Sequence, residues 1–286
     1  MQSRWALGAV FFLMGCGSAT PGTDDGGPVG GDDAAVVDAA VDSPMQFGDS
    51  APEDGGLCNP PDMLVVLDRS DSMSKPPGGA DAGASKWSLA VAAIEDISAA
   101  PIDTTLRFGL ELLPDQAAEK TDAGSCASGL LAIDPNLGNG AAIATTLGST
   151  QLLNGTPVGA ALGVAQTTLA GEHVDGRGQN VLLVTDGKET CDGVPALPVV
   201  QSLATAGVNT YVVGFGGAVD AAMLNDLACA GKTAQNFVAS CKQTKSGWVA
   251  SVPDTTHVFY DATSGDDLKN ALDSITTGTC CGCQVN

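Results

Sequence analysis

The chain has 286 residues, enough for one large α/β domain with additional segments. Its 33 acidic residues outnumber the 12 basic ones and give a formal net charge of −21. That balance excludes nucleic-acid binding, which needs clustered lysine and arginine, and it disfavours electrostatic attachment to anionic lipid. Two interpretations of the charge stay open: solubility of an exported protein, or concentration of divalent cations at its surface.

Residues 1–15 have the pattern of a bacterial export signal. A positive charge at Arg4 precedes a ten-residue apolar stretch, and Leu-Met-Gly then leads into Cys16. The stretch is too short to span a bilayer and fits a signal peptide. The Leu-x-Gly-Cys pattern resembles a bacterial lipobox, which implies that Cys16 is the first mature residue, is lipidated, and anchors the chain to the cell envelope. With Gly17 next, the resemblance implies the outer membrane or cell surface of a Gram-negative host. The alternative is an ordinary signal peptide cleaved nearby.

Residues 16–57 predict a tether behind this anchor. After the cysteine they are rich in Gly, Asp, Ala, Pro and Ser, with nine acidic residues, no basic residue and a single aromatic, Phe47. Such a segment cannot bury enough apolar surface to offset its chain entropy. We therefore expect a disordered, self-repelling tether that holds a folded domain, residues 58–286, away from the membrane. A segment without a role is the alternative.

Eight cysteines remain after Cys16, and an even number in an exported chain indicates structural disulfides. They are Cys58, Cys126, Cys191, Cys229, Cys241, Cys280, Cys281 and Cys283. Eight cysteines allow 105 pairings, so the sequence leaves the connectivity open. The Cys-x-x-Cys at the end of the chain would also suit zinc or a redox pair, but no second such motif and no suitably spaced histidine accompanies it.

The predicted domain begins with an apolar run at 63–67, bounded by Pro60-Pro61 and by polar residues. Such a run predicts a strand buried on both faces, as in parallel sheets. A loop signal follows at 75–79, and apolar residues then recur at helical spacing over 86–99. Residues 105–113 alternate between polar and apolar and predict a strand nearer the sheet edge.

The rest of the chain continues this alternation. Further strands are predicted near 130–133, 181–184, 208–214 and 256–260, and helices at 140–147, 156–169, 195–206, 220–230 and 266–275. Thr156 is the predicted helix N-cap, with Pro157 at the first helical position. Residues 231–255 are polar and are predicted to be irregular. The alternation predicts a doubly wound, mainly parallel α/β sheet with helices on both faces.

Oxygen-bearing side chains follow these elements in three places. Asp68, Ser70 and Ser72 directly follow the first predicted strand. Thr156 opens a later helix, and Asp186 directly follows the second central strand. Because ligands bind beyond the carboxyl ends of parallel strands, we expect the three loops to converge. Taken singly, each residue has an ordinary interpretation as a turn former, a loop serine or a helix cap.

Three segments together resemble the von Willebrand factor type A (vWA) domain and its metal-ion-dependent adhesion site (MIDAS): Asp68-Arg69-Ser70-Asp71-Ser72, Gly155-Thr156-Pro157 and Thr185-Asp186-Gly187. The resemblance covers about residues 60–277 and implies a Rossmann-like vWA fold. It also implies a metal site made of Asp68, Ser70, Ser72, Thr156 and Asp186. Mg²⁺ is the expected ion, with Mn²⁺ or Ca²⁺ as alternatives. The resemblance implies that the metal accepts an Asp or Glu carboxylate from a protein partner.

The chemistry of these side chains agrees with that interpretation. Hydroxyl ligands are neutral, so direct ligation by Ser70, Ser72 and Thr156 leaves most of the charge of a divalent ion uncompensated. Asp68 and Asp186 then act through water and hydroxyl hydrogen bonds that orient the ligands. Lysines 75 and 188 are expected as solvated charges on the same face.

Two other classes of function were weighed against metal-dependent binding. A structural or scaffolding envelope lipoprotein would keep the metal site only for stability, or as a vestige. A hydrolase is disfavoured, because the chain has no Gly-x-Ser-x-Gly motif. Its two histidines, His173 and His257, also stand beside no serine in a strand-end loop. The chain is therefore not expected to be an enzyme.

Overall fold

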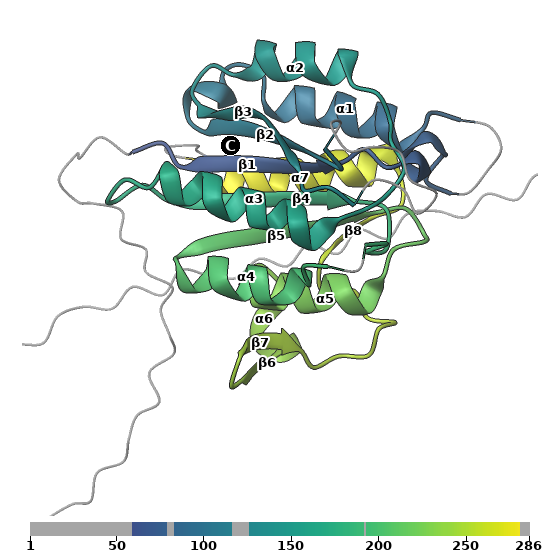
Figure 1. The fold of residues 1–286 in the computed structure, drawn as a ribbon, viewed down its shortest axis with the longest axis vertical. Coiled ribbons are helices and arrows are strands. Elements are labelled where there is room, and N and C mark those ends of the chain that lie inside the picture. The colour runs from purple at the N-terminus through teal and green to yellow at the C-terminus, as the bar shows by residue number, and fades with distance from the viewer. Residues whose placement is uncertain (1–58, 79–82, 116–125, 192, 281–286) are drawn as a thin grey trace, which may run out of the picture. The chain divides into compact units, whose positions relative to one another are not determined.

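A six-stranded sheet forms the centre of the computed structural model, which describes residues 59–78, 83–115, 126–191 and 193–280 (Figure 1). The strands are β1 Asp62–Asp68, β2 Arg107–Leu113, β3 Leu130–Asn136, β4 Gln179–Thr185, β5 Val208–Phe215 and β8 Tyr260–Ala262. They lie in the order β3-β2-β1-β4-β5-β8. All neighbouring pairs are parallel except β2 and β3, which are antiparallel. The predicted mainly parallel α/β fold is confirmed.

Several predictions concern residues outside the described part of the chain. The predicted signal peptide, Cys16 and the acidic segment to residue 57 lie there, as do Cys58, Cys281 and Cys283. All described residues belong to one compact unit, Glu53–Asn286. None of the helices in the described part is both long enough and apolar enough to cross a bilayer.

Six helices cover the two faces of the sheet. Helices α1 (Lys86–Ile97), α2 (Gly140–Ser149) and α7 (Gly265–Thr279) pack on one face, and α3 (Val158–Gly171), α4 (Ala196–Thr205) and α5 (Ala221–Ala230) on the other (Figure 1). Three short helices complete the set: η1 (Asp71–Ser74), η2 (Ile102–Thr104) and α6 (Phe237–Ser240). The helices on both faces leave the central strands no contact with water.

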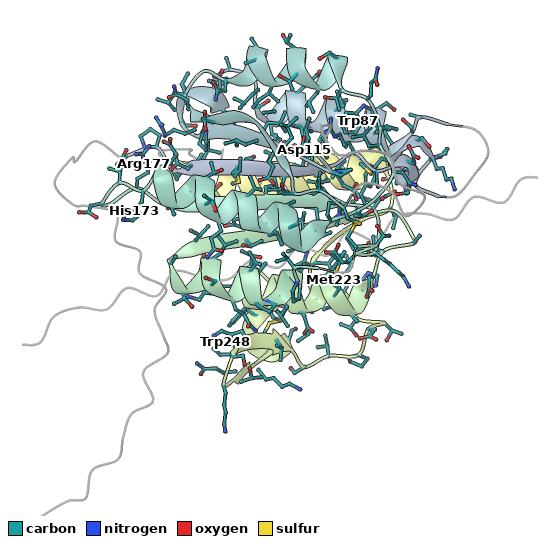
Figure 2. The ribbon with its side chains drawn as sticks, viewed as in Figure 1. Trp87, Asp115, His173, Arg177, Met223 and Trp248 are labelled. Atoms are coloured by element: carbon teal, nitrogen blue, oxygen red, sulfur yellow. A yellow bond between two sulfur atoms is a disulfide. The ribbon has the colours of Figure 1, made fainter. Side chains whose placement is uncertain are left out.

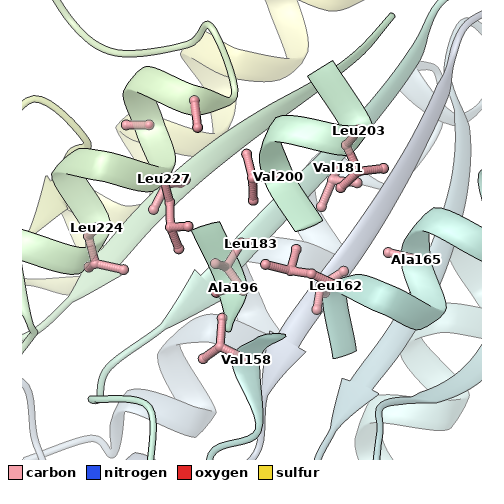
Figure 3. Close-up of a cluster of buried hydrophobic side chains, with 14 of the residues drawn as sticks. Val158, Leu162, Ala165, Val181, Leu183, Ala196, Val200, Leu203, Leu224 and Leu227 are labelled. Carbon is pink, nitrogen blue, oxygen red and sulfur yellow. The ribbon is translucent and has the colours of Figure 1, made fainter. Parts of the chain in front are cut away.

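Strand β1 lies at the centre of the hydrophobic core. All seven of its residues are buried. Successive side chains of a strand point to opposite faces, so Leu64 and Val66 join the cluster under α3, α4 and α5, while Val65 and Leu67 join the cluster under α1, α2 and α7. Figure 3 shows the first cluster, where Leu162 and Val200 lie over Leu183. Burial of each large aliphatic side chain stabilises the fold by about 1.5–3 kcal/mol, which holds the end of β1 rigidly in place.

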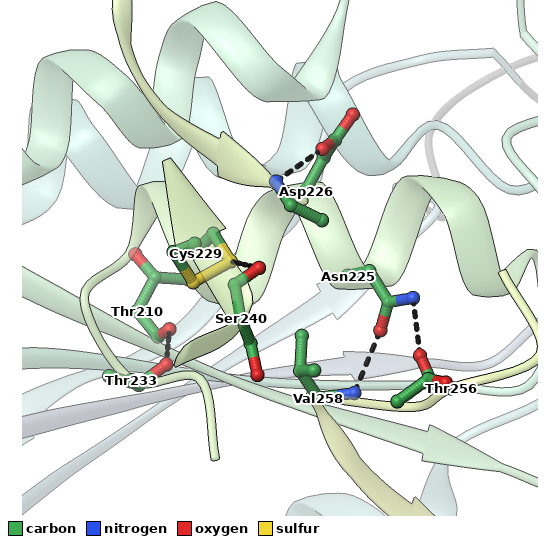
Figure 4. Close-up of a disulfide and its surroundings, with 10 residues drawn as sticks. Thr210, Asn225, Asp226, Cys229, Thr233, Ser240, Thr256 and Val258 are labelled. Carbon is green, nitrogen blue, oxygen red and sulfur yellow. Dashed lines mark hydrogen bonds between the residues drawn. A yellow bond between two sulfur atoms is a disulfide. The ribbon is translucent and has the colours of Figure 1, made fainter. Parts of the chain in front are cut away.

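The prediction of an irregular segment at 231–255 was wrong. Helix α6 is followed there by a two-stranded antiparallel hairpin, β6 (Cys241–Thr244) and β7 (Gly247–Ala250). A disulfide joins Cys229 of α5 to Cys241 (Figure 4), and the Phe237 and Trp248 rings lie 4.8 Å apart. The disulfide and the aromatic pair stabilise a hairpin whose mostly polar residues show no apolar alternation.

The last strand was predicted too early. Residues 256–259 precede β8 as a loop, although Val258 and Phe259 are buried. Asn225 of α5 holds this loop: its Oδ1 accepts from the Val258 backbone N–H at 2.8 Å, and its Nδ2 donates to the Thr256 carbonyl at 2.9 Å (Figure 4). The strand-like pattern at 256–259 therefore reflects burial of the apolar side chains of a loop that is not hydrogen-bonded into the sheet.

Candidate metal centre

The ends of β1 and β4 bring Asp68 beside Thr185. The two strands are parallel and in register up to Leu67 and Val184. The Thr185 hydroxyl donates to Asp68 Oδ2 at 2.7 Å, and the Ser70 backbone N–H donates to Asp68 Oδ1 at 2.8 Å. Both carboxylate oxygens thus accept hydrogen bonds from the protein, which fixes Asp68 as the base of the loop that follows.

Ser70, Ser72 and Asp186 form a chain of hydrogen bonds. The two serine hydroxyl oxygens lie 2.9 Å apart, and the Ser72 hydroxyl donates to Asp186 Oδ1 at 2.7 Å. Ser70 and Asp186 are buried, and Ser72 is half-buried. The loop after β1 and the loop after β4 therefore meet through side-chain oxygens, as predicted from the sheet topology.

Thr156 completes the group, but its predicted role as a helix cap was wrong. The N-cap of α3 is Pro157, with no side-chain cap. The carboxylate of Glu189 instead accepts from the Gly159 backbone N–H at 2.8 Å. This arrangement leaves the Thr156 hydroxyl unused for capping.

The position of Thr156 is fixed from the loop after β4. Its backbone N–H donates to the Thr190 hydroxyl at 2.8 Å. A Cβ placed on Gly187 would lie 3.8 Å from the Thr156 hydroxyl oxygen and 3.9 Å from that of Ser72. Both hydroxyls therefore face the same small space above Gly187, and a side chain there would intrude on it.

A disulfide stabilises the loop that carries Asp186. Cys191 is bonded to Cys126, 65 residues earlier in the chain. Between Asp186 and Cys191 stand Glu189 and Thr190, which bond to the start of α3. Burial raises the pKa of Glu189, while hydrogen bonds from the Gly159, Cys191 and Val158 backbone lower it. The disulfide thus anchors the chain immediately after Glu189 and Thr190, the residues that position Thr156.

Arg69 ties the loop after β1 to the chain that follows β2. Its buried guanidinium donates two hydrogen bonds to the Pro114 carbonyl, of 2.8 Å from Nε and 2.7 Å from one terminal nitrogen. Its own carbonyl accepts from the Leu153 backbone N–H at 2.9 Å. Sequence reasoning gave this residue no role, yet it ties the loop to the end of β2.

The two buried carboxylates of the centre, Asp68 and Asp186, repel each other. Burial, and after it the charge of Asp186, raise the pKa of Asp68 to about 6, against the opposing hydrogen bonds from Thr185 and Ser70. A cation between these groups would offset that repulsion. Within the ranges that the structure describes, three or more His, Cys, Asp or Glu side chains nowhere gather into a metal-binding group.

Sequence reasoning missed a buried cation at this edge of the sheet. Lys75 and Lys188 are exposed, as predicted, but Lys86 is buried and forms an ion pair with the Asp186 carboxylate. A lysine that opens a predicted helix is usually solvated. The only sequence signal was Ser85 before it, which caps α1 by accepting from the Ser88 backbone N–H and so sets where the helix begins.

Comparison with known proteins identifies the fold. Residues 136–247 match the family model of the von Willebrand factor type A domain. The pilus adhesin SpaC from Lactobacillus rhamnosus GG has a similar structure, with a TM-score of 0.51 at 14% sequence identity. Proximal thread matrix protein 1 from the mussel byssus, solved with a zinc-occupied MIDAS motif, has a TM-score of 0.50 at 17% identity. The chain has the vWA fold.

The extent of these similarities differs from one to the next. The vWA match includes Thr156 and Asp186, but it begins at residue 136 and so leaves out Asp68, Ser70 and Ser72. The similarity to SpaC covers 77% of this chain and 30% of SpaC, and the similarity to the mussel protein covers 76% of this chain and 47% of that protein. This chain thus spans less than half the length of either. No curated protein matches it in sequence.

Proposed function

We propose that this chain is a metal-dependent protein-binding module. Ser70, Ser72 and Thr156 bind a divalent cation directly, and Asp68 and Asp186 orient the hydroxyls and the metal-bound waters. The observation that carries the proposal is the convergence of three hydroxyls and two carboxylates from three loops at the carboxyl edge of one sheet. Each residue alone suits a turn, but the set suits a hard cation that prefers oxygen ligands.

The donor set determines what the metal does. Three neutral hydroxyls take little of the charge of the ion, and Asp68 is already engaged by Thr185 and the Ser70 backbone. A bound Mg²⁺ or Mn²⁺ stays electrophilic and accepts one more oxygen from outside, most simply a Glu or Asp carboxylate of a protein partner. The structure of the mussel protein holds zinc in its MIDAS motif, which supports a divalent ion here.

Binding is favoured over catalysis because neither histidine contacts a serine of the centre. Figure 2 labels His173 near Arg177, where β1 begins, at the opposite end of the strand from Asp68. His173 pairs with Asp175 at 3.5 Å, and His257 with Asp261 at 2.7 Å. A Ser-His pair for acyl transfer requires hydrogen-bond contact between them.

The proposed site of action is outside the cytoplasm. Two disulfides, Cys126–Cys191 and Cys229–Cys241, lie in the described part of the chain, and structural disulfides persist in oxidising compartments. Together with the predicted export signal and the predicted lipidation of Cys16, they support a lipid-anchored protein of the bacterial envelope, with the vWA fold on an acidic tether.

The test is chelator-sensitive capture. The purified chain, immobilised in Mg²⁺, is exposed to envelope proteins of its host, and bound proteins are eluted with EDTA. We expect a partner that elutes with EDTA and is not retained by an Asp186→Ala chain. Capture that survives both EDTA and the substitution would contradict metal-bridged binding and favour a scaffolding role with a purely stabilising site.

A further inference from the structure

Lys86 occupies an unusual place for a lysine. It is the first residue of α1, its side chain is only 8% exposed, and its ammonium pairs with an Asp186 carboxylate that is 0% exposed. A cation in the first turn opposes the helix dipole, and burial of an ammonium is costly unless it is paired. The helix start thus disfavours a buried positive charge, and the ion pair with Asp186 offsets the cost of burying the Lys86 ammonium.

The fold provides space for this side chain. Gly216 follows β5 with φ +101°, and a Cβ placed there would lie 3.1 Å from Lys86 Cδ and 3.3 Å from the Pro77 carbonyl oxygen. The Lys86 backbone N–H donates to the Lys75 carbonyl at 2.8 Å. The stem of Lys86 is therefore held between the loop after β1 and the end of β5, aimed at the carboxylate.

We propose that Lys86 is a positioning residue that sets how much charge the metal keeps, an inference that rests on the proposed function. Its ammonium neutralises one of the two carboxylates, Asp68 and Asp186. With a divalent ion bound among them, the centre as a whole would carry about one net positive charge, where without Lys86 it would carry none. Lys86 weakens metal binding and strengthens the attraction of the bound metal for an incoming carboxylate.

A cavity beside the centre extends this positive charge toward a partner. It has a volume of about 500 Å³ and is lined by Lys75, Lys86, Gly217 and Thr263, together with residues 76–78 and 218. Lys86 is one of its two lysines and pairs with Asp186, so the cavity adjoins the centre. Acidic groups of a partner would be favoured over basic ones in this cavity.

The test compares Mn²⁺ affinity with carboxylate affinity in full-length variants. Isothermal titration gives the Mn²⁺ dissociation constant, and water proton relaxation of the Mn²⁺-loaded protein reports displacement of bound water by added acetate. For Lys86→Met we expect Mn²⁺ binding about tenfold tighter and acetate binding several-fold weaker. Lys86→Gln, which keeps a polar group near Asp186, should shift both affinities in the same directions.

Lys188→Met is the matched control, because it removes an exposed charge two residues from Asp186. Its Mn²⁺ affinity should stay within about twofold of wild type, since solvent screens exposed charges. Mn²⁺ binding that is unchanged or weaker in both Lys86 variants would overturn the role of Lys86 while leaving the metal site intact. No Mn²⁺ binding by the wild-type chain would instead overturn the proposed function, and this inference with it.

Discussion

The Ser72 hydroxyl donates a 2.7 Å hydrogen bond to Oδ1 of Asp186, a residue 114 positions further along the chain. This contact joins the loop after β1 to the loop after β4, and Ser72 also touches the Ser70 hydroxyl. The protein's own hydrogen bonds thus assemble the candidate metal centre. Preassembly predicts that single side chains affect metal binding far more than they affect folding.

Ser72→Ala should lose most of the stabilisation that Mg²⁺ gives. In EDTA the substitution removes two part-buried hydrogen bonds, one to Asp186 and one shared with Ser70, at a cost of about 1–3 kcal/mol in the free energy of unfolding. In Mg²⁺ the loss should be larger, because a metal ligand is also gone. Urea denaturation in EDTA and in Mg²⁺ measures both. Ser74→Ala is the control, since that hydroxyl is exposed and donates to the Asp71 carbonyl. An equal Mg²⁺ response in all three proteins would contradict the role of Ser72.

The two described disulfides should have separable effects. Replacing Cys126 and Cys191 together by serine frees the loop behind Thr190, so we expect lower stability and several-fold weaker Mn²⁺ binding. Replacing Cys229 and Cys241 should lower stability by a comparable amount, about 2–5 kcal/mol. It should leave Mn²⁺ affinity unchanged, because that disulfide joins α5 to the β6–β7 hairpin and to no loop of the centre. Thermal melts and Mn²⁺ titration of both double variants provide the comparison. Equal losses of Mn²⁺ affinity would rule out a specific link between the first disulfide and the centre.

Glu111 should make the metal-free protein less stable as pH rises. This residue of β2 is fully buried, and neither carboxyl oxygen has a hydrogen-bond partner in the described part of the chain. A Cβ on Gly129 would lie 1.8 Å from its Oε1, so that glycine makes room for it. Burial raises the pKa of Glu111 from 4.5 to about 9. Between these values the folded state binds the extra proton, so its stability falls with rising pH.

Glu111→Gln tests this in EDTA by urea denaturation from pH 5 to pH 9. The neutral amide does not titrate. The free energy of unfolding of the variant should therefore increase relative to that of wild type as pH rises, by at most about 1.4 kcal/mol per pH unit. Asp254→Asn, an exposed substitution with the same change in charge, should stay parallel to wild type. A constant difference between Glu111→Gln and wild type across this range would mean that Glu111 does not titrate there.

Much of the fold follows from sequence pattern alone. The apolar runs of β1 and β4 identify strands buried on both faces, and the parallel arrangement of those strands requires that Asp68 and Asp186 emerge at one edge. Thr156 also lies at this edge, near Ser72 and Gly187, but not as the predicted helix cap. Its position depends on Glu189 and Thr190, contacts about 30 residues away that no local pattern reveals.

The features that sequence reasoning missed depend on partners distant in the chain. Lys86 resembles a solvated helix-start lysine until Asp186, 100 positions later, lies against it. The hairpin of β6 and β7 has polar outward-facing residues, so its strands carry no apolar alternation, and the Cys229–Cys241 pairing could not be chosen among 105 possibilities. Tertiary contacts, rather than local propensity, decide these features.

Anomalous diffraction from crystals grown in Mn²⁺ tests the central claim most directly. We predict one strong manganese peak at the carboxyl edge of the sheet, within coordination distance of the hydroxyl oxygens of Ser70, Ser72 and Thr156. A crystal with no manganese peak at this edge, or with manganese bound only elsewhere, would contradict the account.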